Sequence, residues 1–79
     1  MTLNDVRKTS RCRVSRVTAG GMLGQRLNDM GFCPGTDILF VRRAPLQDPI
    51  HVQIGTYHVA LRRNEARFVE LTFSTPVNE

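Results

Sequence analysis

Two histidines and two cysteines are the residues of this chain best suited to metal chemistry. His51 and His58 are its only imidazoles, and Cys12 and Cys33 are its only thiols. A stable zinc site takes three or four such ligands, and the cysteines are too far apart in sequence for a Cys-x-x-Cys motif. His51, His58 and Cys33 are therefore weak candidates for binding a divalent metal. Other readings stay open: the histidines are two solvated residues on a sheet face, and the cysteines are two reduced thiols or form a disulfide.

The chain shows no pattern typical of a catalytic or nucleotide-binding site. A hydrolase needs a serine, cysteine or threonine beside an oriented base, but the alternation of residues 50–61 places both histidines opposite the apolar sheet face. The glycines of residues 20–24 open a predicted helix, yet they match neither GxxxxGK[ST] nor GxGxxG. We therefore expect no catalytic residue, no cofactor and no enzymatic activity.

Arginine supplies ten of the eleven basic side chains, and the formal net charge is +4. Five basic residues lie between residues 7 and 16, and two further pairs follow at Arg42-Arg43 and Arg62-Arg63. Such charges fit an acidic protein or membrane-proximal partner, a nucleic acid, or plain solvation. The two pairs are our candidates for contact with a protein partner.

The aromatic residues argue against a nucleic-acid surface. Single strands are bound by exposed aromatic side chains on which bases stack. Periodicity instead assigns Phe40, Tyr57 and Phe73 to apolar strand faces. We therefore expect no nucleic-acid partner.

Leu46 is an apolar residue in the middle of a loop that is braced by Pro45 and Pro49. Two prolines cannot both lie within a strand ladder, so residues 44–49 are predicted as a loop. Its tip either folds back on the domain or faces a partner, and Leu46 joins the arginine pairs as a candidate contact.

These side chains are carried by a mainly β chain with one short helix after the first strand. Five segments have strand patterns: residues 11–18, 36–43, 50–54, 57–61 and 67–73. A break in alternation predicts a bulge near Ser15 or Arg16. Residues 21–30 form the helix, which Gly31 ends. Five short strands without a βαβ rhythm predict a small SH3-like antiparallel barrel.

Residues 50–61 give the clearest local prediction. Apolar residues alternate on both sides of a phase slip at Gly55-Thr56, which a two-residue turn explains. The resulting hairpin puts every apolar pair on one face, namely Ile54 opposite Tyr57, Val52 opposite Val59 and Ile50 opposite Leu61. His51 and His58 then become diagonal neighbours on the other face.

The 79 residues suffice for one domain, with an ordered core of roughly 3–73 and polar ends. Hydrophobic residues make up 41% of the chain, but no apolar run reaches the ~20 residues of a membrane helix. The first nine residues lack the apolar stretch of a secretory signal. We therefore expect a cytoplasmic protein.

Three segments stand out when taken together: QRLNDMGFCPGT at residues 25–36, RAPLQDPIHV at 43–52 and VALRRNEA at 59–66. They resemble the FeoA family of small accessory proteins in bacterial ferrous iron transport. The order is collinear and the likeness covers roughly residues 3–72. Gln47 stands where the family usually has glycine, and Cys33 where it usually has an aliphatic residue.

The resemblance implies an SH3-like domain without catalytic activity. It also implies a regulatory adaptor that binds the cytosolic GTPase-bearing part of the FeoB ferrous iron permease, and so reaches the inner face of the membrane only through that partner. Two alternatives are a metal-responsive domain related to the C-terminal domains of iron-dependent repressors, and a basic nucleic-acid-binding barrel.

Overall fold

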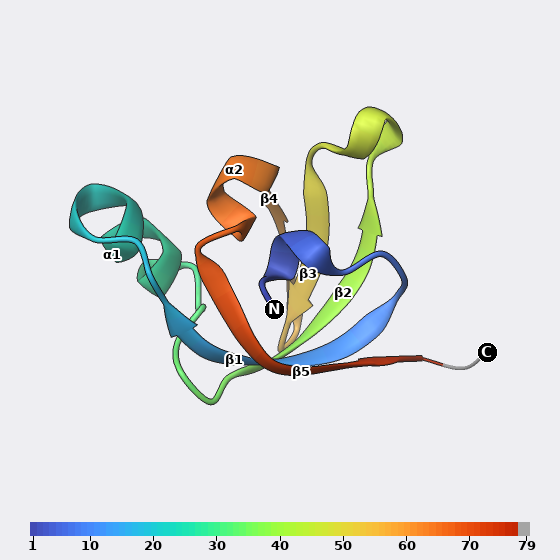
Figure 1. The fold of residues 1–79 in the computed structure, drawn as a ribbon, viewed down its shortest axis with the longest axis horizontal. Coiled ribbons are helices and arrows are strands. Elements are labelled where there is room, and N and C mark those ends of the chain that lie inside the picture. Colours follow the sequence, from blue (N-terminus) through green and yellow to red (C-terminus); the bar gives the residue numbers. More distant parts are fainter. Residues whose placement is uncertain (78–79) are drawn as a thin grey trace.

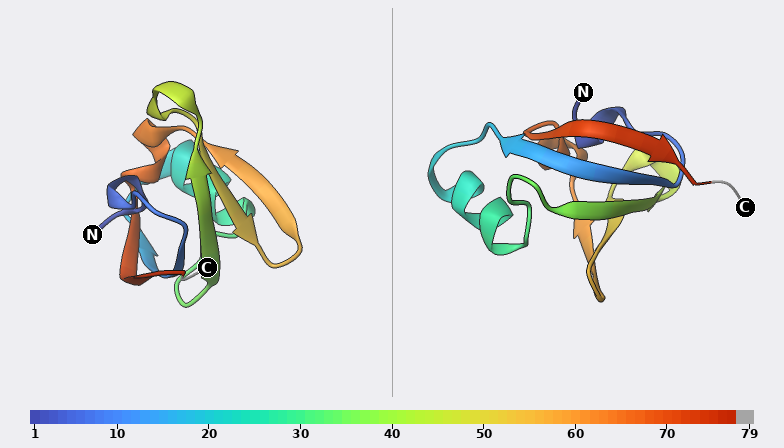
Figure 2. Two further views of the ribbon diagram at one scale, coloured as in Figure 1. Left: turned by 90° about the vertical axis from the view of Figure 1, so that its right-hand side faces the viewer. Right: turned by 90° about the horizontal axis from the view of Figure 1, so that it is seen from below.

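The computed structural model describes residues 1–77, except for the side chain of Gln47. Five antiparallel strands form one curved sheet in the order β4-β3-β2-β1-β5 (Figure 1). The strands are β1 (Ser10–Val17), β2 (Asp37–Arg43), β3 (Ile50–Ile54), β4 (Tyr57–Leu61) and β5 (Val69–Pro76). The predicted mainly β fold is confirmed, and its strong curvature is clear when the sheet is turned (Figure 2).

Helices occupy the connections between these strands. The predicted helix is α1 (Gly21–Asp29), directly after β1, and a single turn, α2 (Arg63–Ala66), precedes β5. Two short 3-10 segments, η1 (Leu3–Asp5) and η2 (Pro45–Gln47), complete the chain. Gly31, which follows the C-cap residue Met30, takes φ of 109°, a left-handed conformation typical of the residue that ends a helix.

The hairpin of β3 and β4 has the predicted register at every pair. Ile54 lies opposite Tyr57, Val52 opposite Val59 and Ile50 opposite Leu61. Gly55 begins the turn with φ of 59°, a conformation that glycine adopts without a steric penalty. Local alternation and one glycine are therefore enough to predict this element.

Bulges in the β1–β5 pair redirect one aromatic side chain. The first is the one predicted near Ser15, because Val14 pairs with Leu71 and Arg16 with Glu70. A second, unpredicted shift leaves Thr72 without a partner between the pairs of Arg13 and Val14. An extra residue reverses the face of those that follow. The assignment of Phe73 to the core is therefore wrong, and this side chain is 40% exposed.

The core includes the N-terminal segment, which no periodic pattern indicates. Leu3 and Val6 are buried together with Phe32, Phe40 and Leu61. Tyr57 lies on the predicted apolar face, opposite Ile54, yet it is 48% exposed at the sheet edge, and its hydroxyl donates to the carbonyl of Met30 at 2.8 Å. Tyr57 thus fastens the hairpin to the end of α1 instead of filling the core.

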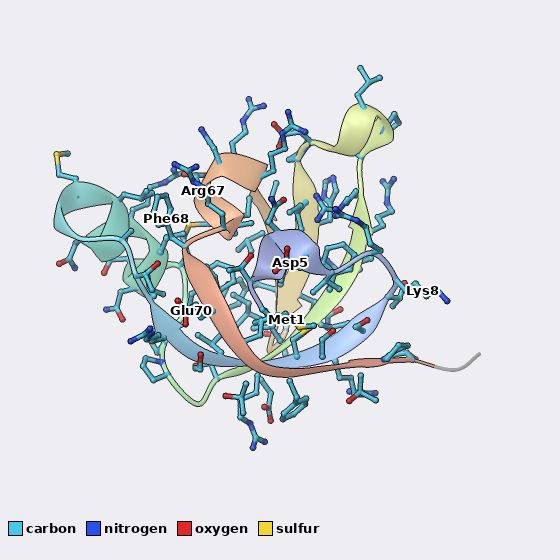
Figure 3. The ribbon with its side chains drawn as sticks, in the orientation of Figure 1. Met1, Asp5, Lys8, Arg67, Phe68 and Glu70 are labelled. Atoms are coloured by element: carbon cyan, nitrogen blue, oxygen red, sulfur yellow. The ribbon has the colours of Figure 1, made fainter. Side chains whose placement is uncertain are left out.

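The ends of the described chain are more regular than the polar composition suggests. The amide of Leu71 donates to the carbonyl of Met1 at 2.9 Å, and Thr2 forms a bridge with Glu70. Met1 accordingly lies next to β5, the strand that carries Glu70 (Figure 3). The last strand also continues to Pro76, three residues beyond its predicted end. Of the predicted polar tail, residues 78–79 lie outside the described residues.

Candidate partner-binding surface

The candidate contact residues come together at one end of the sheet. Arg43 in β2 pairs with Ile50 in β3, which pairs with Leu61 in β4, so the end of β2 lies near the end of β4. The η2 loop and α2 extend from these strands and lie at the same end of the molecule (Figure 1). We call this surface the basic end, and it consists of Arg42, Arg43, Leu46, Arg62 and Arg63.

Leu46 faces solvent at the tip of the η2 loop. Its relative exposure is 94%, and its φ of 70° is unusual for a residue other than glycine. The loop is closed beneath it by the amide of Ala44, which donates to the carbonyl of Pro49 at 2.9 Å. Of the two positions predicted for this tip, the structure has the exposed one.

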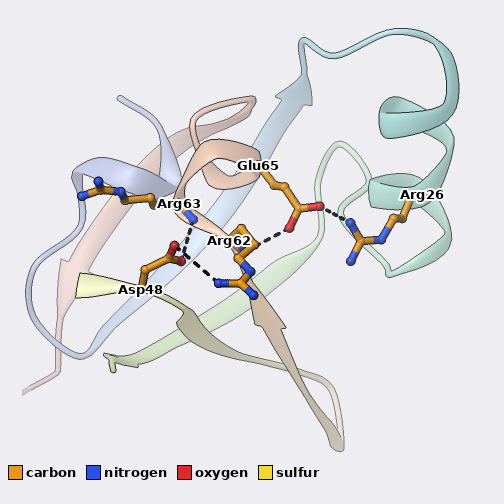
Figure 4. Close-up of polar contacts among 5 residues, drawn as sticks. All are labelled: Arg26, Asp48, Arg62, Arg63 and Glu65. Carbon is orange, nitrogen blue, oxygen red and sulfur yellow. Dashed lines mark hydrogen bonds and ion pairs between the residues drawn. The ribbon is translucent and has the colours of Figure 1, made fainter. Parts of the chain in front are cut away.

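Asp48 fixes the η2 loop to α2. Its Oδ1 accepts a hydrogen bond from the backbone amide of Arg63 at 3.1 Å, and its Oδ2 lies 3.8 Å from Nη1 of Arg62 (Figure 4). The Arg62 side chain remains 69% exposed. At that separation and exposure the ion pair contributes little, roughly 0–1 kcal/mol. The backbone bond is therefore what sets the position of the loop, and most of the positive charge still faces solvent.

Glu65 positions the other side of α2. Its Oε1 accepts from the amide of Arg62 at 3.0 Å, and its Oε2 is paired with the Arg26 guanidinium of α1 (Figure 4). The Glu65 residue is buried, whereas the Arg26 side chain is 58% exposed. Sequence reasoning missed the role of Glu65, although its place three residues after Arg62 is the usual position for capping the start of a helix.

Arg43 differs from the other arginines of the basic end. Its guanidinium donates to the carbonyls of Asn4 and Val6, and it lies 5.8 Å from the centre of the Phe40 ring. Burial lowers the pKa of Arg43, and the neighbouring charges of Arg7 and Arg63 lower it further. Arg43 therefore connects the N-terminal segment to the sheet, and Arg42, Arg62 and Arg63 present the charge to solvent.

The candidate metal ligands do not come together as a site. His51 pairs with Ala60 and His58 with Gln53, so the two histidines are diagonal neighbours on one face, as predicted. Cys33 lies after α1, where its thiol donates to Oδ1 of Asn28 at 3.2 Å. Within residues 1–77, no three or more histidine, cysteine or acidic side chains lie close enough together to hold a metal ion.

No helix in the described part of the chain is long and apolar enough to span a membrane.

Cys12, the other cysteine, is part of the core, since it is only 1% exposed and its thiol donates to Oγ of Ser74 at 3.5 Å. Desolvation by burial raises the pKa of the Cys12 thiol, and hydrogen bonds to Ser74 and to the Phe40 backbone partly oppose that rise. Cys12 is thus a core residue whose thiol is not exposed to solvent.

Comparison with known proteins gives one consistent family. The chain is 35% identical over 71 residues to a fusion of Fe(2+) transport protein A with the Fe(2+) transporter FeoB from Porphyromonas gingivalis. That alignment covers 90% of this chain but only 8% of the fusion protein. The chain therefore corresponds to a small part of its curated relative.

Solved structures agree with this result. The iron(II) transport protein A of Clostridium thermocellum matches with a TM-score of 0.84 and 38% identity, over 90% of this chain and 44% of that one. FeoA of Stenotrophomonas maltophilia, an SH3 domain protein solved in complex with zinc, matches with a TM-score of 0.78 and 31% identity, over 90% and 88%. The FeoA domain model matches residues 1–72. The chain therefore has the predicted SH3-like fold and belongs to the FeoA domain family.

Proposed function

We propose that this chain is a non-enzymatic accessory protein of bacterial ferrous iron uptake that binds the cytosolic GTPase-bearing part of a FeoB-type permease. The observation that carries the proposal is the Porphyromonas gingivalis fusion, in which a domain like this one and a FeoB transporter share one polypeptide. Fusion keeps two domains at high effective concentration, which favours an interaction between them. We assign the same interaction to this chain.

The basic end is the surface that we assign to this contact. Leu46 supplies an exposed apolar side chain that a partner pocket can bury, at a gain of roughly 1.5–3 kcal/mol. Arg42, Arg62 and Arg63 are exposed at the same end of the molecule and add positive charge, which steers association with an acidic partner. A central apolar anchor with a charged rim is the usual organisation of a protein–protein interface.

A binding measurement tests the proposal directly. The full chain is titrated by calorimetry with the purified cytosolic part of the FeoB-type permease from the same genome, with GDP, with a GTP analogue and without nucleotide. We expect saturable one-to-one binding in at least one of these states. The absence of binding in all three would overturn the proposed function.

Two variants test the assigned surface. Leu46→Ser and Arg62→Glu are expected to weaken binding by about fivefold or more each, as residues of an interface centre do. Arg16→Glu is the matched control, because Arg16 is similarly exposed but lies at the far end of β1. Unchanged affinity for both variants, with unchanged unfolding curves, would move the contact away from the basic end.

A further inference from the structure

The outer face of the sheet carries a second set of side chains, none of them part of the basic end, which the proposed function does not use. Strand pairing places side chains from β5, β1, β2 and β3 in two neighbouring rows on this face. One row contains Phe73, Arg13 and Asp37, and the next contains Thr75, Arg11, Leu39 and Gln53. The view from below in Figure 2 looks onto β5, β1 and β2, which lie side by side there.

A groove of about 260 Å³ runs between these rows and the turn of the β3–β4 hairpin. Its outward-facing lining residues are Arg11, Asp37, Leu39, Gln53, Gly55 and Phe73. Small-molecule pockets usually measure roughly 300–1,000 Å³. The groove is therefore better matched to one or two side chains of a partner than to a whole small ligand.

One wall of the groove is held in place before any partner binds. The Arg13 guanidinium lies 5.3 Å from the centre of the Phe73 ring, and its Nε donates to Oδ1 of Asp37 at 2.7 Å. A second donation, from Nη2 to Oδ2, measures 3.3 Å. Asp37 thus orients Arg13, and Arg13 covers part of the aromatic ring. Such preorganisation reduces the entropy lost on binding.

Arg11 gives the groove its charge preference. Its side chain is exposed, and within residues 1–77 it makes no hydrogen bond or ion pair. Leu39 is its cross-strand neighbour and supplies half-buried apolar surface. An unpaired guanidinium next to an aliphatic side chain and an aromatic ring suits a ligand that is both anionic and apolar.

We propose that this groove binds an extended acidic segment of a partner protein, with a carboxylate on Arg11 and an adjacent apolar side chain against Phe73 and Leu39. The bulge at Thr72 is the feature that makes the site, because it moves Phe73 from the core to the outer face. β-Bulges commonly redirect a side chain at a functional site. The inference concerns a different surface from the basic end and does not depend on the permease being the partner.

Nuclear magnetic resonance with a defined probe tests this inference. The labelled full chain is titrated with the peptide acetyl-Glu-Leu-Glu-Phe-Glu-amide and, separately, with the same peptide carrying lysine in place of glutamate. We expect the acidic peptide to shift the amides of Arg11, Leu39 and Phe73 in a saturable way. The lysine peptide should not shift the resonances of these amides. Equal shifts with both peptides, or shifts confined to the basic end, overturn the proposal.

Two variants and their controls link the shifts to the groove. Phe73→Ser and Arg11→Gln should each reduce peptide affinity by about fivefold or more. Met22→Ser and Arg16→Gln make similar changes at exposed positions outside the groove and should leave affinity unchanged. Since all four residues are exposed, the folded spectrum should persist. Unchanged affinity in both groove variants would also overturn the proposal.

Other occupants give different results in the same experiment. A titration with oligothymidylate that shifts the groove amides more strongly than the acidic peptide would identify a nucleic-acid site and overturn the proposal. Spectra recorded at two protein concentrations without peptide report on a second copy of the chain. Groove shifts that depend on concentration alone, and that block the peptide, would assign the groove to self-association instead.

Discussion

Gly31 is constrained both by its backbone conformation and by its tertiary contacts. It takes φ of 109° two residues after the end of α1, in a region that other residues rarely adopt. A Cβ at this position would lie 2.6 Å from the hydroxyl of Tyr57. That hydroxyl is also the donor that fastens the hairpin to the carbonyl of Met30. Glycine is therefore required here for two independent reasons.

Gly31→Ala is expected to destabilise the domain by more than the roughly 1–3 kcal/mol of backbone strain alone. Gly35→Ala is the control, because Gly35 also has positive φ, 87°, but a Cβ there meets nothing within 4 Å. Urea unfolding of both variants measures the difference. In a Tyr57→Phe background the extra cost of Gly31→Ala should shrink, since the clashing hydroxyl is gone. An equal cost for the two glycines would contradict this explanation.

Cys12 should make stability fall at alkaline pH. Burial raises the pKa of its thiol above the ordinary value of 9.0, so the folded state keeps the proton more tightly than the unfolded state. The resulting stability is present below pH 9 and is lost as pH rises through the pKa of the folded state. Urea unfolding at about pH 7 and about pH 10 should show a larger loss for the parent than for Cys12→Ala.

Cys33→Ala is the matched control for that pH experiment, because Cys33 is only half-buried. It should lose as much stability between the two pH values as the parent does. Parallel pH curves for the parent and Cys12→Ala would show that the thiol does not carry the effect.

Among the secondary-structure elements, α2 depends most on side chains from elsewhere. A single helical turn is not stable by its own hydrogen bonds. Here Glu65 accepts the Arg62 amide and pairs with Arg26 of α1, while Asp48 accepts the Arg63 amide from the other side. The carboxylates of Asp48, after the η2 segment, and of Glu65, within α2, thus set the positions of Arg62 and Arg63.

Substitutions at Glu65 should separate these contributions. Glu65→Ala leaves the Arg62 amide without its acceptor and is expected to cost about 1–3 kcal/mol. Glu65→Gln keeps an acceptor for that amide and should cost less. Arg26→Ala removes only an exposed partner and should cost about 0–1 kcal/mol. Chemical denaturation ranks the three, and a larger loss for Arg26→Ala than for Glu65→Ala would reverse our assignment.

Across the whole molecule, the N-terminal segment completes the fold. Leu3 is fully buried, Arg43 binds the carbonyls of Asn4 and Val6, and Met1 and Thr2 line the free edge of β5. A domain of this size has a total stability of roughly 4–12 kcal/mol. Losing one large core side chain therefore removes a considerable fraction of it.

The same substitution at two leucines tests this view. Leu3→Ala should destabilise the domain by about 2–5 kcal/mol, because it leaves a cavity in the core. Leu46→Ala should change stability by less than about 0.5 kcal/mol, since Leu46 is 94% exposed. Thermal unfolding of the two variants is the measurement. A clear loss of stability in Leu46→Ala would mean that the loop tip packs on the domain in solution.

Most of the strands were predictable because their determinants are local. The hairpin of residues 50–61 follows from alternation and one glycine, and the bulge at Ser15 follows from a break in alternation. The end of α1 follows from Gly31. Collinear resemblance to the FeoA family also predicted the fold class. The first three inferences needed only residues close together in sequence, and the fourth needed only the order of three short segments.

Features that depend on distant partners emerge only in the folded chain. The Thr72 bulge exposes Phe73 because β5 must match β1, a strand more than fifty residues away. Arg43 and Arg42 are adjacent in sequence, yet Arg43 is the one held by carbonyl acceptors from the N-terminal segment. Local patterns along the chain were thus sufficient for the strands, the turns and the family. Pairing and packing between distant segments decide on which face of the sheet a side chain such as Phe73 lies and which groups a side chain such as Arg43 contacts. No local pattern encodes either.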